Sequence, residues 1–272
     1  MNKVLVGLSN KITENSSKIN VWSESFKKHS DGDVILLVSN ATEDDIKECQ
    51  KLNIDYRLVE INDTWYINHK RLLPTKEFIS TSDYDAYLIT DVFDVLFQSD
   101  PFEKFELDKY DLFFTAEGIK VSEEPWNGDV IIKVFGSEIE TCRNTEIVCS
   151  GIIGGKKNEL IDLYDKMYTK CESGTNNHNI KDQAALILLL SNNHLKNYKI
   201  FNLNEAWAMH CATSGPTQFF KSWGMEGIIK SRYNVPTLID GKICMEDGTP
   251  FDIVHQFNRI PEWKEILTKN YV

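Results

Sequence analysis

Two carboxylates close an apolar stretch of this chain, in the segment Tyr87-Leu-Ile-Thr-Asp91-Val-Phe-Asp94-Val-Leu-Phe-Gln98. The apolar residues predict a buried strand, and an ionised carboxylate that is taken out of water needs a partner. Asp91 and Asp94 repel each other unless a cation lies between them, and a divalent metal ion meets that requirement. Because Asp100-Pro101 follows and proline ends a strand, the carboxylates are predicted to lie where a strand opens into a loop. Ligands of α/β sheets bind at such strand ends.

The spacing of these carboxylates imposes a condition on the backbone. Residues two apart share one face of a strand, whereas residues three apart do not. Asp91 and Asp94 can therefore converge on one ion only if the strand turns between them. The alternative interpretation makes one side chain part of a strand-end turn and the other a loop cap.

Three more motifs carry residues that could do chemistry. They are Ser150-Gly151 within Cys149-Ser-Gly-Ile-Ile-Gly-Gly155, Asp182-Gln183, and His255-Gln-Phe-Asn-Arg259. Each has a structural alternative. Ser150-Gly151 could be only a tight exit from a strand, and Asp182 could be only the N-cap of the helix that follows it. A lone histidine on a strand, such as His255, is more often a hydrogen-bonded core residue than a ligand.

The elements that must position these residues alternate between strand and helix. With 272 residues and 42% apolar content, the chain can bury a substantial core. This alternation predicts an α/β fold with a mostly parallel sheet covered by helices on both faces. We expect strands at 3–9, 33–39, 55–61, 85–97, 111–116, 146–155, 199–203 and 251–257, and helices at 19–28, 42–52, 159–171 and 183–190.

Two segments are less regular. Residues 67–81 are predicted to be helical with an interruption near Pro74, and residues 117–144 are predicted to be a long excursion that forms a lid or a substrate wall. We find no linker that would divide two domains, and residues 102–109 are the only plausible boundary between the two halves of the chain. Within 117–144, Glu123-Glu124 is expected to form a solvated face.

Charge and cysteine usage exclude several classes of protein. A net charge of −11 and a pI near 5.1 argue against a nucleic-acid partner, with residues 221–232 as a weak local basic patch. The six cysteines form no Cys-x-x-Cys pair, so neither a zinc cluster nor a dithiol redox centre is indicated. No stretch has the length of a membrane span, which predicts a cytoplasmic protein. Peripheral membrane contact through Lys221-Ser-Trp223 and 259–269 stays open, because these residues could equally cover the edge of the core.

In this order, the motifs resemble the nucleotide-sugar-dependent glycosyltransferases of the GT-A fold. The resemblance covers nearly the whole chain, although the sequence has Asp91-x-x-Asp94 where that family has Asp-x-Asp. It implies one Rossmann-like domain, 1–272, with a nucleotide-binding half at 1–105 and an acceptor and sugar-binding half at 106–272. The motif order is most like that of the retaining galactosyltransferase and glycogenin-like group, so we favour retention of configuration.

The resemblance also implies residue roles. Asp91, Asp94 and His255 would hold Mn²⁺ or Mg²⁺, with Asp91 also near the ribose. The base would lie against Gly7, Leu8 and Ser9, and the donor sugar against Ser150, Gly151, Asp182 and Gln183. Lys70, Arg71 and Arg259 would add positive charge, and Glu205 would be an acceptor-side carboxylate with a structural role equally open. The proposed catalytic residues are Asp182, Gln183 and Glu205.

The physical reason for such a set is the leaving group. A nucleoside diphosphate leaves with roughly two to three negative charges, which a divalent ion neutralises as a Lewis acid. A histidine ligand favours Mn²⁺ over Mg²⁺. The expected reaction is transfer of a sugar from a UDP-linked donor to a glycan, a lipid-linked sugar, a protein or a small molecule.

Two alternatives remain at this point. A sugar-phosphate nucleotidyltransferase would need a Gly-rich, Arg-containing loop after the first strand, but Gly7-Leu-Ser-Asn-Lys-Ile-Thr-Glu14 has one glycine and no arginine. The other alternative is a nucleotide-sugar-binding protein without catalysis. The aromatic residues are equally ambiguous, because Trp126, Trp223 and the segment Trp207-Ala-Met209-His210 could line an acceptor pocket or pack in the core.

Overall fold

The computed structural model describes residues 1–61, 67–178, 180–214, 236–269 and 271. Its centre is a mostly parallel sheet in which only β7 runs antiparallel to its neighbours, among the described strands. The strands lie in the order β3 (Asp55–Val59), β2 (Asp33–Ser39), β1 (Lys3–Ser9), β4 (Ala86–Thr90), β7 (Glu146–Gly155), β6 (Leu112–Lys120) and β8 (Tyr198–Phe201). The predicted α/β fold class is therefore confirmed.

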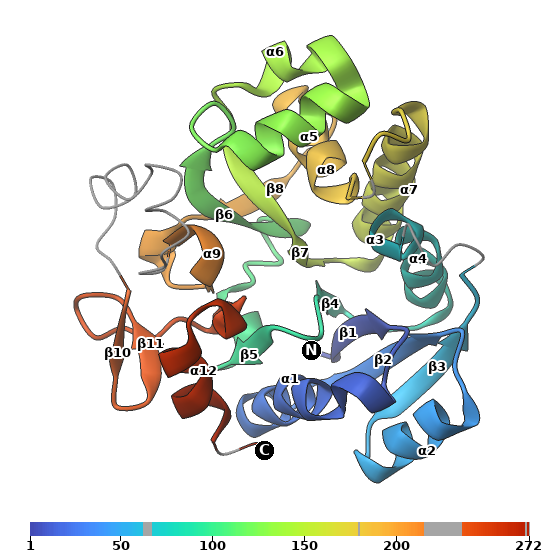
Figure 1. Cartoon of the computed structure of the whole chain (residues 1–272), viewed down its shortest axis with the longest axis vertical. Helices are drawn as coiled ribbons and strands as arrows, with labels where there is room; N and C mark the ends of the chain where they lie inside the picture. The colour runs from blue at the N-terminus through green and yellow to red at the C-terminus, as the bar shows by residue number, and fades with distance from the viewer. Residues whose placement is uncertain (62–66, 179, 215–235, 270, 272) are drawn as a thin grey trace.

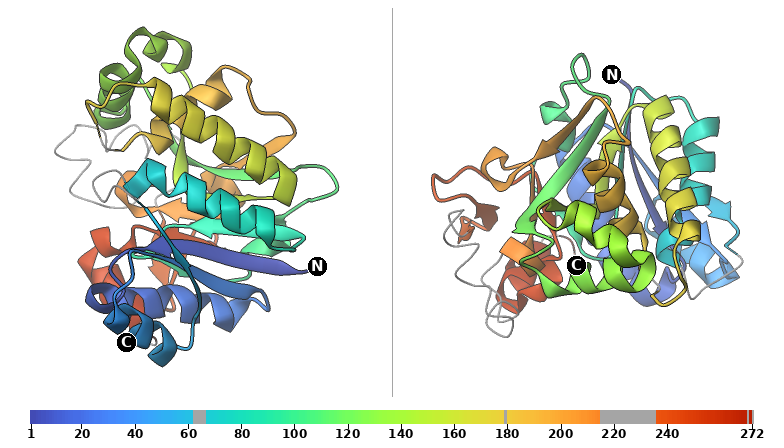
Figure 2. Two further views of the ribbon diagram at one scale, coloured as in Figure 1. Left: turned by 90° about the vertical axis from the view of Figure 1, so that its right-hand side faces the viewer. Right: turned by 90° about the horizontal axis from the view of Figure 1, so that it is seen from above.

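Helices cover both faces of this sheet because its central strands are apolar on both sides. Leu5 and Leu36 pack with Trp22 of α1, whereas Val6 and Leu37 belong to the core that includes α4, α7 and α8. Figure 1 shows α1 and α2 on one side of β1 to β3, and Figure 2 shows α4 and α7 side by side on the other. These helices are α1 (Ser16–His29), α2 (Glu43–Lys51), α3 (Ile67–Lys70), α4 (Leu72–Thr81), α7 (Lys157–Ser173) and α8 (Asp182–Ser191).

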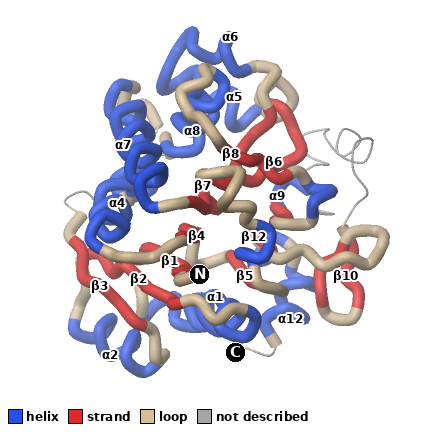
Figure 3. The backbone as a smooth tube through the Cα atoms, turned by 180° about the vertical axis from the view of Figure 1, so that it is seen from behind, coloured by secondary structure: helices blue, strands red, loops and turns tan. Residues whose placement is uncertain are grey.

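A second, smaller sheet lies beside the first. It has the order β5 (Val95–Phe97), β12 (Ile253–His255) and β9 (Ala208–His210), with β12 antiparallel to β5 and parallel to β9. The hairpin of β10 (Thr237–Ile239) and β11 (Lys242–Cys244) lies at the edge of the molecule (Figure 3). Two short helices, α9 (Cys211–Ser214) and α12 (Pro261–Thr268), follow β9 and β12 in the chain. None of the described helices is long and apolar enough to cross a membrane.

Three predicted elements were wrong by more than a few residues at their ends. The strand expected at 85–97 is two strands, β4 and β5, in different sheets. The excursion expected at 117–144 continues β6 to Lys120 and then forms α5 (Pro125–Phe135) and α6 (Ile139–Cys142). The helix expected at 67–81 breaks at Arg71, not at Pro74, because Pro74 lies in the first turn of α4, where a backbone N–H has no helical partner to lose.

Candidate active site

The backbone turns between Asp91 and Asp94, which is the condition that their spacing imposed. β4 ends at Thr90 in the large sheet, and β5 begins at Val95 in the small one. Hydrogen bonds hold both ends of the turn: the Asp91 N–H donates to the Gly151 carbonyl at 2.9 Å, and the Gln256 N–H donates to the Asp94 carbonyl at 2.6 Å. The turn is therefore fixed by β7 on one side and by the end of β12 on the other.

The two carboxylates meet His255, which ends β12. Its Nε2 lies 3.6 Å from Asp91 Oδ2 and 3.7 Å from Asp94 Oδ1, and one ligand atom from each residue lies within 4.8 Å of the others. His255 Nε2 is buried and makes no hydrogen bond. Buried polar atoms are normally bonded, so an unbonded nitrogen that faces two carboxylates fits a divalent metal ion with nitrogen and oxygen ligands.

Burial and nearby charges have opposing effects on the pKa values of this cluster. Burial raises the pKa of Asp91, but Arg71 and His255 outweigh it and hold that pKa well below its ordinary value. Burial raises the pKa of Asp94. Burial would lower the pKa of His255, but Cys149 and the two carboxylates raise it above its ordinary value. The Arg71 guanidinium therefore supplies positive charge beside the carboxylates.

Arg71 connects the metal cluster to the start of α8. Its guanidinium donates to Asp91 Oδ1 and, at 2.9 Å, to Asp182 Oδ2. Asp182 is thus not the N-cap of α8, which is Lys181, but the first helical residue, with its side chain turned to Arg71. Its other oxygen, Oδ1, is buried and has no hydrogen-bond partner.

Gln183 is held by hydrogen bonds at both ends of its amide. Its Oε1 accepts from the Ser150 N–H at 3.3 Å, and its Nε2 donates to Asn127 Oδ1 at 2.9 Å and to Glu117 Oε1 at 3.3 Å. Asn127 is held in turn by Glu124, which accepts from the Asn127 backbone and side chain. This network fixes which face of the Gln183 amide meets the pocket.

Sequence reasoning missed Glu117 and misplaced Glu124. Glu117 is buried on β6, and burial raises its pKa to about 7, opposed by the charge of His255 and by hydrogen bonds from Thr213 and Gln183. Glu124 is also buried and not on a solvated face, because it is the N-cap of α5 and accepts from the Trp126 and Asn127 N–H groups. The available signal was Pro125, since proline favours the first helical position after a cap.

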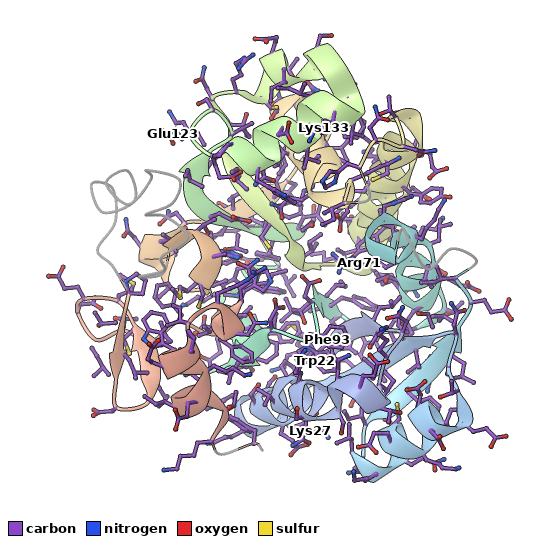
Figure 4. All side chains as sticks on the ribbon, viewed as in Figure 1. Trp22, Lys27, Arg71, Phe93, Glu123 and Lys133 are labelled. Carbon is purple, nitrogen blue, oxygen red and sulfur yellow. The ribbon has the colours of Figure 1, made fainter. Side chains whose placement is uncertain are left out.

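Two clefts meet at Arg71 and Asp91. The larger has a volume of about 440 Å³ and the smaller about 230 Å³. Figure 4 shows Arg71 and Phe93 near the centre of the molecule, where these clefts lie. The larger cleft is lined by Arg71, Asp91, Glu117, Glu124, Trp126, Asn127, Cys149, Ser150, Gly151, Ile180, Asp182, Gln183, Ala212, Thr213, His255, Gln256 and Arg259. The smaller cleft is lined by Leu8, Ser9, Asn10, Arg71, Asp91, Val92, Phe93 and Asp94.

Three residues of the predicted site lie outside both linings. The Gly7 backbone packs under Val92 and Trp22, where a Cβ would clash with both. The Lys70 ammonium donates to Glu172 at 3.1 Å and to Tyr168 at 3.4 Å. Glu205 closes a capping box by accepting from the Asn202 N–H, and it pairs with Lys199 at 3.0 Å.

The aromatic residues divide between core and pocket. Trp207 is fully buried, packs against Phe105 and Phe201, and donates its indole N–H to the Pro101 carbonyl at 2.9 Å. Met209 and His210 are buried too. Trp126 is 37% exposed and lines the larger cleft. The predicted basic patch at 221–232 lies outside the described residues, as does Trp223 with the predicted membrane contact at Lys221-Ser-Trp223.

Comparison with solved structures identifies the fold. The galactosyltransferase LgtC, in complex with donor and acceptor sugar analogues, aligns with a TM-score of 0.59 and 12% identity over 98% of this chain and 95% of that chain. An active-site mutant of LgtC that replaces a glutamine by glutamate aligns with the same values. The chain therefore has the GT-A glycosyltransferase fold. No protein-family model and no curated protein sequence matches it.

Proposed function

We propose that this chain is a metal-dependent glycosyltransferase that moves a sugar from a UDP-linked donor to a hydroxyl acceptor. The observation that carries the proposal is the convergence of Asp91, Asp94 and His255 where the two clefts meet. A nucleotide sugar has its diphosphate between its nucleoside and its sugar. A cation site between two clefts would therefore meet the diphosphate, with the nucleoside in one cleft and the sugar in the other.

Asp91, Asp94 and His255 would hold Mn²⁺ or Mg²⁺, with Asp91 also within reach of the ribose. When bound, the ion would neutralise the charge that develops on the departing diphosphate. Arg259 lines the larger cleft and supplies a further cation for the same group. We assign Lys70 no direct contact, because its ammonium is committed to Glu172 and Tyr168.

The smaller cleft would take the nucleoside, in the half of the chain that spans 1–105. Leu8 and Ser9 line it and would lie against the base, together with Asn10 and Phe93. Gly7 would act indirectly, because its missing side chain lets Trp22 and Val92, a residue of the turn between the carboxylates, pack against its backbone.

The larger cleft would take the donor sugar and the acceptor. Asp182 Oδ1 is unbonded and faces no protein donor, so it is suited to accept a hydrogen bond from a sugar hydroxyl. Ser150 and Gly151 allow the backbone to approach the ring, and Gln183 presents a fixed amide beside it. An active-site glutamine is the residue changed in the LgtC mutant, and we propose an active-site role for Gln183 in this chain. From the order of the sequence motifs, we favour retention of configuration.

The acceptor-side carboxylate is better assigned to Glu117 than to Glu205. Glu117 lines the larger cleft and has its pKa raised to about 7 by burial, so it can exchange a proton with a hydroxyl near neutral pH. Glu205 lies outside the cleft with its carboxylate in a capping box. The acceptor class remains a glycan, a lipid-linked sugar, a protein or a small molecule, and the expected compartment is the cytoplasm.

The experiment is a thermal-shift panel of nucleoside diphosphates and their sugars, with and without Mn²⁺. A ligand at one hundred times its dissociation constant adds about 2.7 kcal/mol of stability. We expect a UDP sugar to stabilise the native chain only with Mn²⁺, and Asp94→Ala to abolish this shift. Asp108→Ala, at an exposed carboxylate, is the matched control and should keep it. If no nucleotide shifts the native chain under any metal condition, the proposal fails.

Turnover separates the two remaining functions. A transferase releases UDP from a UDP sugar in the presence of Mn²⁺, slowly to water and faster to an acceptor hydroxyl. A nucleotide-sugar-binding protein would show the metal-dependent thermal shift without UDP release. Glu117→Gln should lower the rate of transfer while it leaves the UDP-sugar shift in place.

A further inference from the structure

His210 lies directly behind His255, on the side of the imidazole away from the carboxylates. The two residues are partners in the parallel pair of β9 and β12, so their side chains leave the sheet on the same face. Their Nδ1 atoms are 3.0 Å apart, and the rings meet edge to face at an angle of 81°. Both side chains are buried. A nitrogen-to-nitrogen distance of 3.0 Å requires a proton between the two atoms.

The position of that proton decides what His255 Nε2 can do. A histidine binds a metal ion through a nitrogen that carries no proton, and the other ring nitrogen then donates to a neighbouring acceptor. His210 can accept at Nδ1 if its own proton is on Nε2. Its Nε2 has a partner for that proton, because Thr115 Oγ1 lies 3.2 Å away. The chain of donors therefore runs from His255 to His210 and on to Thr115.

The opposite arrangement is less well satisfied. If His210 donated to His255, the only proton of a neutral His255 would be on Nε2, where Asp91 and Asp94 are 3.6 and 3.7 Å away, too far for hydrogen bonds. Cys149 Sγ lies 3.5 Å from His255 Nδ1 and could donate there, but a thiol is a weak donor and His210 is closer. His210 is thus the partner that leaves the Nε2 lone pair available.

We propose that His210 is a positioning residue that accepts the Nδ1 proton of His255 and so holds the Nε2 lone pair toward the metal cluster. This inference rests on the proposed function, since it gives His210 a role in metal binding. His210 itself would contact neither the ion nor the substrate and would act only through His255. Thr115 completes the arrangement by accepting from His210 Nε2.

The first test needs no metal. In the metal-free native chain labelled with ¹⁵N-histidine, we expect a scalar coupling between the two Nδ1 nuclei across the hydrogen bond, with the proton on His255. The nitrogen chemical shifts report which ring carries the proton. A proton on His210 Nδ1 with an unprotonated His255 Nδ1, or no coupling at all, would overturn the proposal regardless of whether the chain binds metal.

The second test measures Mn²⁺ affinity by electron paramagnetic resonance of the free ion, with Mn²⁺ alone and with Mn²⁺ plus UDP. His210→Leu fills a similar volume without an acceptor and should weaken binding about 10- to 100-fold, the usual range for such outer partners. His210→Asn carries an oxygen on Cγ, where histidine carries Nδ1, and should restore most of the affinity. His194→Leu, at an exposed histidine, is the matched control.

The outcomes separate the two proposals. If the native chain and His194→Leu bind Mn²⁺ and His210→Leu binds it equally well, His210 has only a packing role and this inference fails. Equal losses in the Leu and Asn variants, with unfolding midpoints close to that of the native chain, would also contradict it. If the native chain binds no Mn²⁺, the proposed function fails, and the coupling measurement alone then decides the hydrogen bond.

Discussion

The backbone of Gly151 packs directly against the carboxylate of Asp91. The Asp91 N–H donates to the Gly151 carbonyl at 2.9 Å, and a Cβ at position 151 would lie 2.6 Å from Asp91 Oδ2 and 3.1 Å from His255 Cε1. A side chain at this position would enter the space between two of the three proposed metal ligands. Glycine is therefore required for close approach here, and no left-handed backbone is involved.

Gly151→Ala should weaken Mn²⁺ binding by about tenfold or more, because one extra methyl in a packed site costs about 1–3 kcal/mol. Gly128→Ala is the matched control, since a Cβ there would meet its neighbours at 3.4 Å, an ordinary contact. Mn²⁺ titration of both variants is the measurement. Unchanged affinity in Gly151→Ala would mean that Asp91 or His255 lies elsewhere when the ion binds.

Arg71→Met should destabilise the chain by about 3 kcal/mol, because it leaves Asp91 and Asp182 without their common cation. Urea unfolding without metal measures this loss. Lys70→Met removes the neighbouring cation, whose partner Glu172 is half exposed, and should cost less than about 1 kcal/mol. In the double variant Arg71→Met, Asp182→Asn, the loss should be smaller than in Arg71→Met alone. Equal losses at the two neighbouring positions would contradict the prediction.

Glu117→Gln should change how stability depends on pH. The pKa of Glu117 is raised from 4.5 to about 7 in the folded chain, so between these values the folded state binds more protons than the unfolded state. Stability therefore falls as pH rises through this window, by about 3 kcal/mol for this group. The glutamine variant lacks the effect. Relative to the native chain, it should gain stability between pH 5 and pH 8 in urea unfolding, and parallel curves would rule out the raised pKa.

Asp45 should affect the pH dependence of stability in the opposite direction to Glu117, because its contribution is lost as pH falls. Burial raises its pKa, but hydrogen bonds from Thr13 and Thr42 outweigh burial and lower the pKa from 3.8 to about 2. Its contribution of about 2 kcal/mol is present above pH 3.8 and is lost as pH falls toward 2. Asp45→Ala should lose this stability at pH 6 and differ less from the native chain at pH 2. Asp44→Ala, at the exposed neighbour, should stay close to the native chain at both pH values.

The sequence predicted the central elements well because their patterns are local. Continuous apolar runs at 3–9 and 33–39 correspond to β1 and β2 with the predicted bounds, and Thr42 caps α2 in a box with Asp45. The two-sided burial of these strands and the alternation with helices were sufficient for the α/β fold class. The break of 85–97 into two sheets was less predictable, since β5 leaves the large sheet to pair with β12, a distant strand.

The site was predictable only in part, for a physical reason. Motif order pointed to Asp91, Asp94, Asp182 and His255, which the structure brings to neighbouring positions. Glu117 was missed because its surroundings come from far along the chain: α9 packs over β6, and Gln183 of α8 donates to the Glu117 carboxylate. Glu205 satisfied the sequence criteria for an acidic site residue, yet its carboxylate closes the capping box with Asn202. Local sequence does not indicate which carboxylates the fold brings to the cleft.

The pairing of β5 with β12 also affects the order in which the site can be assembled during synthesis. The ribosome releases Asp91 and Asp94 well before β12, the last strand. Until β12 is synthesised, β5 lacks its antiparallel partner, and the two carboxylates lack His255 and the Gln256 N–H. The first strands and helices of the sheet can form in the meantime. Cation binding would then be a late step of folding, because the segment that includes β12 supplies both the third proposed ligand, His255, and the Gln256 N–H that bonds to the turn.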